Sequence, residues 1–140
     1  MRINVHLFVL VTVVSQCVSG VAKANPCPQF EAKRVEETIQ QVETWPQFAA
    51  FYNKYKTCDV DALRYAFTQQ IAHLAGDDQG LVGLAKLLAR QPHLKPIVLG
   101  HLRSEAVSSE DRDRISNALR ACKPAHKRVC RDVRNALELE

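Results

Sequence analysis

The sequence predicts an all-α fold of six or seven short helices in antiparallel pairs, stapled by disulfides, as a compact bundle or a short helical solenoid. Three observations lead to this prediction. Nearly every segment after residue 28 repeats its apolar residues at helical spacing. Proline, glycine and capping residues interrupt these segments at short intervals, as they do between helices. No stretch alternates apolar and polar residues between hairpin turns, so strands are not expected.

The first 24 residues have the pattern of a secretory signal peptide. Arg2 precedes an apolar run over residues 7–14, and Ala-Lys-Ala at residues 22–24 fits a cleavage site. The apolar run is far shorter than the roughly 20 residues that a membrane helix needs, which disfavours a retained anchor. We therefore expect export, one helical domain over residues 25–140, and no transmembrane segment once the signal is removed.

Much of the positive charge of the chain belongs to this leading segment. Loss of Arg2 and Lys23, with no acid among the first 24 residues, lowers the formal net charge from +4 to +2. A domain so close to neutral lacks a strong overall field for nucleic acid or membrane. Export also argues against a nucleic-acid partner.

The first two helices are expected on either side of Thr44. Over residues 28–45 the apolar positions share one stripe, with charged residues opposite. Pro46 suits the first turn of a second helix, over residues 46–55. The aromatic residues of this segment share one helical face, which predicts core packing rather than an exposed binding surface: Trp45, Phe48, Phe51, Tyr52 and Tyr55.

Capping residues mark the next helices. Asp59 or Asp61 is the expected N-cap of a third helix, which Gly76 ends. Leucine-rich stripes follow over residues 77–91 and 92–106, separated by a proline.

The last two helices are also bounded by recognisable signals. Ser108 and Asp111 have the spacing of a capping box and begin a helix. Pro124 ends that helix, and an apolar stripe from Val129 to Leu137 predicts the final one.

Four cysteines remain after residue 24, and in an exported chain an even number indicates two disulfides. Pro124 supplies a turn, because proline disfavours helix at the residue before it. Cys122 can then end one helix and face Cys130 in the next, within the roughly 7 Å that a disulfide allows. This leaves Cys27 for Cys58, although four cysteines allow three pairings.

The segment "ACKPAHKRVC" has two further interpretations. Cys122, His126 and Cys130 have C-x3-H-x3-C spacing, but a structural zinc site needs a fourth ligand and usually shorter spacings. We therefore expect no metal and no cofactor. Six basic residues also cluster here, and they form either a solvated helix face or a contact surface for an acidic protein or envelope component: Arg120, Lys123, Lys127, Arg128, Arg131 and Arg134.

The sequence contains no recognisable catalytic motif. Nucleophile elbow, P-loop, zinc-protease helix and glycine-rich dinucleotide turn are all missing. His101, on a largely apolar helix, is expected to be a hydrogen-bonded core or boundary residue rather than a general base. We predict no catalytic residue and no enzyme activity.

From about Trp45 to Cys130 the chain resembles a family of periplasmic immunity proteins that protect Gram-negative bacteria against peptidoglycan-amidase effectors of the type VI secretion system. The motifs that carry the resemblance are "YKTCDVDALRYAFT", "PIVLGHLRSE" and the cysteines of "ACKPAHKRVC". Asp59 matches the first acid after the motif cysteine, while Asp61 stands where the family has glycine. In the second motif His101 matches, whereas Gly100 and Arg103 replace an arginine and an aspartate.

The resemblance implies a periplasmic all-α protein, often dimeric, that blocks the active-site cleft of a secreted amidase by stoichiometric contact. Two other functions remain open. One is a periplasmic carrier or sensor of a small ligand in a helical cavity. The other is a hydrolase whose paired acids come from different helices.

Overall fold

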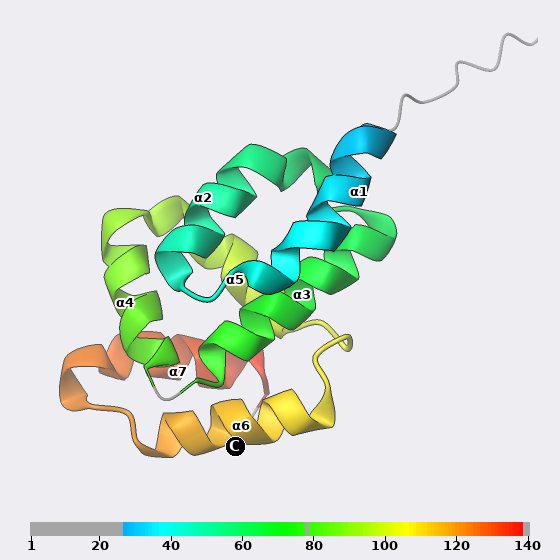
Figure 1. Ribbon diagram of the computed structural model, residues 1–140. Coiled ribbons are helices and arrows are strands. Elements are labelled where there is room, and N and C mark those ends of the chain that lie inside the picture. The colour runs from blue at the N-terminus through cyan, green and yellow to red at the C-terminus, as the bar shows by residue number, and fades with distance from the viewer. Residues whose placement is uncertain (1–26, 78, 139–140) are drawn as a thin grey trace, which may run out of the picture.

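The computed structural model describes residues 27–77 and 79–138, which confirm the all-α prediction. The predicted signal peptide lies outside the described residues. Four 3-10 helices, η1 (Ile39–Gln41), η2 (Lys56–Cys58), η3 (Pro92–Leu94) and η4 (Pro124–His126), connect seven α-helices (Figure 1). The α-helices are α1 (Gln29–Thr38), α2 (Trp45–Tyr55), α3 (Asp61–Ala75), α4 (Gly80–Arg90), α5 (Lys95–Leu102), α6 (Ser109–Arg120) and α7 (Lys127–Ala136).

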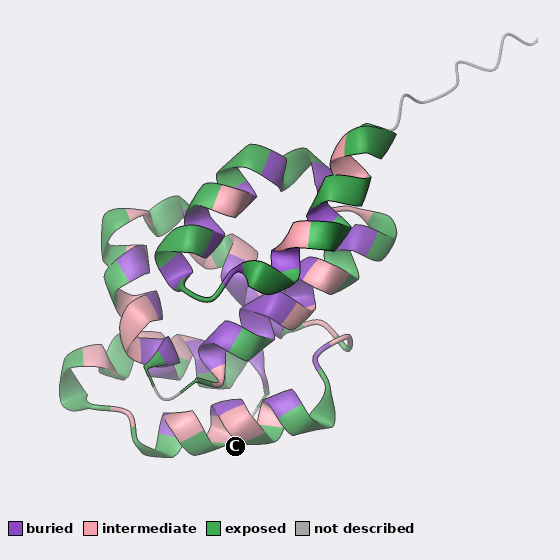
Figure 2. Cartoon of the chain, viewed as in Figure 1, coloured by how far each residue is buried: buried purple, intermediate pink, exposed green. Residues whose placement is uncertain are grey.

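Helix α3 is the centre of the fold. It packs against α1, α4, α5 and α6, so helices distant in sequence share one core around it. Phe67, Ile71, Ala72 and Ala75 of α3 are inaccessible to solvent, and the middle of this helix is mostly buried (Figure 2). A solenoid repeat would contact only its neighbours along the chain. The fold is therefore the compact bundle of the two predicted alternatives.

The aromatic residues of α2 pack into the core, as predicted. Trp45 and Phe48 are buried and make an edge-to-face contact, with ring centroids 5.9 Å apart. Trp45 Nε1 donates a 2.7 Å hydrogen bond to the carbonyl oxygen of Gly80, which joins α2 to α4. A Cβ at Gly83 would lie 2.7 Å from the Trp45 ring, so glycine is required for this close approach. Thr44 and Gln47 form a capping box at the start of α2.

The start of α3 differs from the prediction that Asp59 or Asp61 caps it. Val60 occupies the N-cap position, without a side-chain cap. Asp59 hydrogen-bonds instead to Tyr52 and His101. Asp61 is the first helical residue and has φ 47°, in the left-handed region that favours glycine. The physical reason is that the Asp59 carboxylate hydrogen-bonds to the buried imidazole of His101. Asp59 would lose this partner if its side chain capped the helix.

Both predicted disulfides are confirmed. Cys27 and Cys58 are bonded with their Cα atoms 4.6 Å apart, which ties the start of α1 to η2. Cys122 and Cys130 are bonded with their Cα atoms 6.5 Å apart, across the turn that η4 forms between α6 and α7. These four sulfurs are therefore not thiolate ligands, and the alternative of a Cys122–His126–Cys130 zinc site is wrong. Two disulfides are typical of an oxidising compartment.

The remaining helix boundaries follow the predicted signals. Gly76 is the C-cap of α3, and Pro96 lies in the first turn of α5. Ser108 caps α6 by accepting a 3.0 Å hydrogen bond from the backbone N–H of Asp111. None of the helices in the described part of the chain is long and apolar enough to cross a membrane.

Candidate functional site

The six predicted basic residues are not one cluster in the structure. Arg120 belongs to α6 and hydrogen-bonds to Asn117, whereas Lys123 lies in the turn. Helix α7 turns Cys130 and Val133 into the core and leaves its basic residues exposed. At helical spacing, three of these residues share one flank, and Arg128 lies on the other flank, beside α4. The first flank consists of Lys127, Arg131 and Arg134.

Arg128 borders an open hollow of about 300 Å³ between α4, η3 and α7, which we call the α4–α7 hollow. Its lining is mainly apolar: Ala85, Leu88, Ala89, Pro92 and Val129. Three charged residues complete it. Lys95 and Asp132 form a half-exposed ion pair of 2.7 Å, while Arg128 has no hydrogen bond or ion pair within the described residues.

A second open hollow, of about 210 Å³, lies beside the turn between α6 and α7. The Cys122–Cys130 disulfide forms part of its wall. Leu81 and Val82 of α4 supply apolar surface, and Lys123 and His126 supply polar edges. The disulfide therefore holds part of the wall of this second hollow, and both hollows use residues of α4 and α7.

The charge around these hollows is almost entirely positive. No Asp or Glu occurs between Gln79 and Ser104, whereas Lys86, Arg90 and Lys95 all belong to that segment. Asp132 is the nearest acid on α7, and it is paired with Lys95. Our sequence reasoning singled out the dense basic run at 120–134 and missed this acid-free segment, although its composition was visible. The two segments meet because α4 and η3 pack beside α7 and η4.

A buried polar network joins α2, the residue after η2, α3 and α5. His101 Nε2 is 2.9 Å from Asp59 Oδ2, and His101 Nδ1 is 2.8 Å from Thr68 Oγ1. Tyr52 donates its hydroxyl to the same Asp59 oxygen at 3.2 Å. The predicted hydrogen-bonded core histidine is confirmed, since His101 is 1% exposed.

The network shifts the pKa values of its two acidic residues, Tyr52 and Asp59. Burial, reinforced by the Asp59 carboxylate, raises the pKa of Tyr52 to about 12. Burial alone would raise the pKa of Asp59, but the hydrogen bond and charge of His101, with help from Arg64 and Tyr52, lower it below its usual value. Arg64 Nη1 is 3.8 Å from Asp59 Oδ1, too far for a hydrogen bond, and that oxygen has no hydrogen-bond partner in the described residues.

Thr68, His101 and Asp59 follow the hydroxyl–imidazole–carboxylate order of a catalytic triad. However, Thr68 is 1% exposed, and its hydroxyl donates a 2.9 Å hydrogen bond to the carbonyl oxygen of Arg64. Neither Thr68 nor His101 lines any of the hollows that we describe here. The hydroxyl is therefore out of reach of a substrate in this structure, and the arrangement joins α3 to α5.

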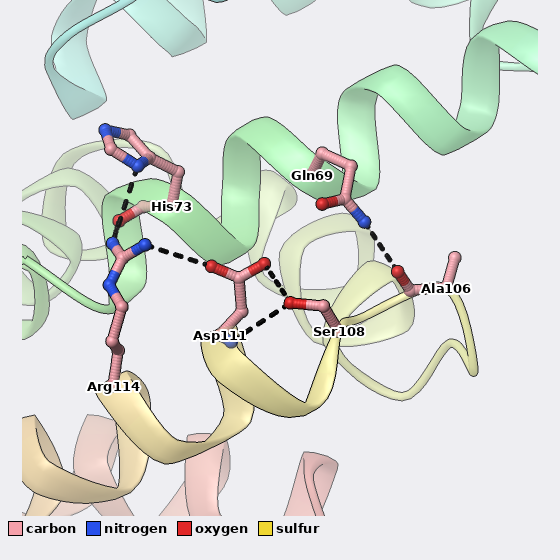
Figure 3. Close-up of polar contacts among 6 residues, drawn as sticks. All are labelled: Gln69, His73, Ala106, Ser108, Asp111 and Arg114. Carbon is pink, nitrogen blue, oxygen red and sulfur yellow. Dashed lines mark hydrogen bonds and ion pairs between the residues drawn. The ribbon is translucent and has the colours of Figure 1, made fainter.

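A second group of polar contacts joins α3 to α6 (Figure 3). Asp111 accepts hydrogen bonds from Ser108 Oγ at 2.7 Å and from Arg114 Nη1 at 3.1 Å. Arg114 also donates to the carbonyl oxygen of His73, and Gln69 Nε2 donates to that of Ala106. The shallow hollow beside these residues is lined by polar side chains, of which Gln69, His73 and Asp111 hydrogen-bond to residues outside the lining. These contacts explain how α6 is held against α3.

The two hollows beside α4 combine apolar lining with basic edges. Open apolar hollows with basic edges offer anchor points for side chains and charges of a partner. Comparisons of the chain with models of known protein families, with curated proteins and with solved structures found no match.

Proposed function

We propose that this protein is a periplasmic immunity protein that inhibits a type VI secretion peptidoglycan-amidase effector by stoichiometric contact, without catalysing a reaction of its own. The observation that carries the proposal is the positively charged surface of α4 and α7 with its open apolar hollows. Such a surface binds a partner of complementary charge and shape.

Two details of the fold support the resemblance on which the identity of the partner depends. Asp59 and His101, which match the family in separate motifs, contact each other in the core. Asp61, which stands where the family has glycine, has the positive φ that favours glycine. The first detail gives the two matching residues a shared place in the core, and the second shows that position 61 has a backbone conformation suited to the glycine of the family motif.

The two disulfides support the part of the proposal that concerns inhibition in the periplasm. An inhibitor that covers a cleft binds more tightly when its contact surface is already rigid. Here the Cys122–Cys130 bond fixes the turn that borders the second hollow, and such bonds persist in an oxidising compartment. A carrier would instead need an enclosed cavity for its ligand, whereas the hollows described above open onto the surface.

Protection of cells tests this proposal directly. Bacteria would produce the exported protein together with each of a panel of amidase effectors directed to the periplasm, and lysis would be followed. We expect survival with at least one effector, and native mass spectrometry should show a complex of that effector with the inhibitor. Lysis with every effector, at normal levels of the oxidised protein, would contradict the proposal.

A further inference from the structure

We propose that the α4–α7 hollow is the anchor point of the interface, and that it takes an apolar side chain from an acidic segment of the partner. This inference deepens the proposed function by naming the chemistry of the partner. It relies on the proposed function only for who that partner is.

The size and lining of the hollow indicate what it accepts. Small-molecule sites occupy roughly 300–1,000 Å³ and enclose most of their ligand. The α4–α7 hollow, at about 300 Å³ and open to the surface, is large enough for one or two side chains. Leu88 and Val129 form part of its floor and also pack against the core, so the floor is held in place. An apolar side chain that entered would lose its contact with water against a fixed surface.

The charges around the hollow indicate what should flank that side chain. Asp132 is already paired with Lys95, so the one acid of the rim is neutralised. The guanidinium of Arg128 has no partner in the described part of the chain and can bind a carboxylate through two parallel hydrogen bonds. Lys86 and Arg90 on α4 add positive charge nearby. A partner segment with carboxylates on either side of an apolar residue would complement the positive charge of Arg128 and α4 while the apolar residue fills the hollow.

The test uses amide chemical shifts of the oxidised protein in NMR spectra. The probe is a synthetic peptide, acetylated and amidated at its ends, with a leucine between glutamates. Control peptides replace either the glutamates by glutamine or the leucine by serine. We expect saturable shifts at Leu88, Ala89 and Val129 with the first peptide and much smaller shifts with both controls.

Two matched variants locate the effect. Arg128→Glu should remove the shifts, because it places a carboxylate on the rim. Arg134→Glu makes the same charge change on the other flank of α7, away from the hollow, and should retain them. The inference is overturned by absent shifts, by equal shifts with all three peptides, or by equal responses of the two variants. Concentration-dependent shifts at the same amides without peptide would also overturn it, since a second copy would then be the occupant.

The outcomes separate this inference from the proposed function. Inhibition of an amidase by a protein that shows no peptide shifts at the hollow would leave the function standing and place the interface elsewhere. Selective peptide shifts in a protein that protects against no amidase would support the hollow as a binding site and contradict an amidase as its partner.

Discussion

Residues 27–77 and residues 79–138 each contain one disulfide, but otherwise they differ in composition and in what they contribute. Every Phe, Trp and Tyr of the described residues lies in the first region, which also has more acids than bases. The second region has no aromatic residue of these types and an excess of bases. The first region therefore supplies the aromatic side chains of the core, and the second supplies buried aliphatic side chains together with the basic surface and its hollows.

The two regions meet where α3 packs against α4, α5 and α6 and where Asp59 hydrogen-bonds to His101, and we call these contacts the joint. Single substitutions in the joint should lower the free energy of unfolding most. Asp59→Ala leaves the buried imidazole of His101 without its carboxylate. Loss of one partner of a buried pair costs about 3–5 kcal/mol in the free energy of unfolding. Denaturant unfolding would measure this loss. Asp132→Ala breaks the half-exposed pair with Lys95 in the second region and should cost no more than about 1 kcal/mol. Equal losses in the two variants would contradict the importance of the joint.

The two disulfides should differ in the stability that they contribute. Cys27 and Cys58 are 31 residues apart, and Cys122 and Cys130 are 8 residues apart. By loop-closure entropy, the double serine variant of the first pair should lose roughly 3–4 kcal/mol and that of the second roughly 2–3 kcal/mol. Thermal unfolding of both variants beside the wild type would measure the order. A larger loss at the shorter loop would show that the turn does more than close a loop.

Acid should weaken the joint through Asp59. Its pKa is lower in the folded protein than the ordinary value of about 3.9 that it has in the unfolded chain. The stabilisation is therefore fully present above about pH 4 and is lost as the pH falls through the folded pKa. Unfolding of the wild type and Asp59→Ala as a function of pH would measure this, and their difference should narrow in acid. A constant difference would contradict the assignment.

The smallest change in stability is expected on the binding surface. Arg128→Glu alters an exposed side chain with no partner in the described residues, so its free energy of unfolding should shift by no more than about 0.5 kcal/mol. Unfolding curves of this variant, of Arg134→Glu and of the wild type should therefore nearly coincide. A large loss for Arg128→Glu would mean that the residue supports the fold, and its binding data would need another control.

The helices and the disulfide across the turn could be predicted from the sequence, because their signals are local. Pro46 and Pro124 mark turns, Ser108 caps its helix, and the Cys122–Cys130 disulfide follows from the turn at Pro124, which leaves Cys27 for Cys58. The N-cap of α3 could not be predicted, because Asp59 hydrogen-bonds to His101, which lies 42 residues further along the chain. A tertiary partner outweighed the local preference for capping.

The binding surface shows the same limit. A basic run from Arg120 to Arg134 is visible in the sequence, but the helix divides it between two flanks. Of the basic residues of α7, only Arg128 lines the α4–α7 hollow, where it lies beside the Lys95–Asp132 ion pair. Most of the apolar lining comes from α4 and η3. Lys95 and Asp132 meet across the fold, a pairing for which no local spacing gives a signal.

The most direct test of the central claim is a titration of amidase activity with the oxidised protein, using an effector that the protein allows cells to survive. We predict that activity falls linearly to a plateau at one inhibitor per enzyme. Arg134→Glu should reproduce the wild-type titration, and Arg128→Glu should weaken inhibition. Full activity at a large excess of the wild-type protein would contradict inhibition by contact. Equal inhibition by both variants would contradict the role of the basic surface beside α4 and α7.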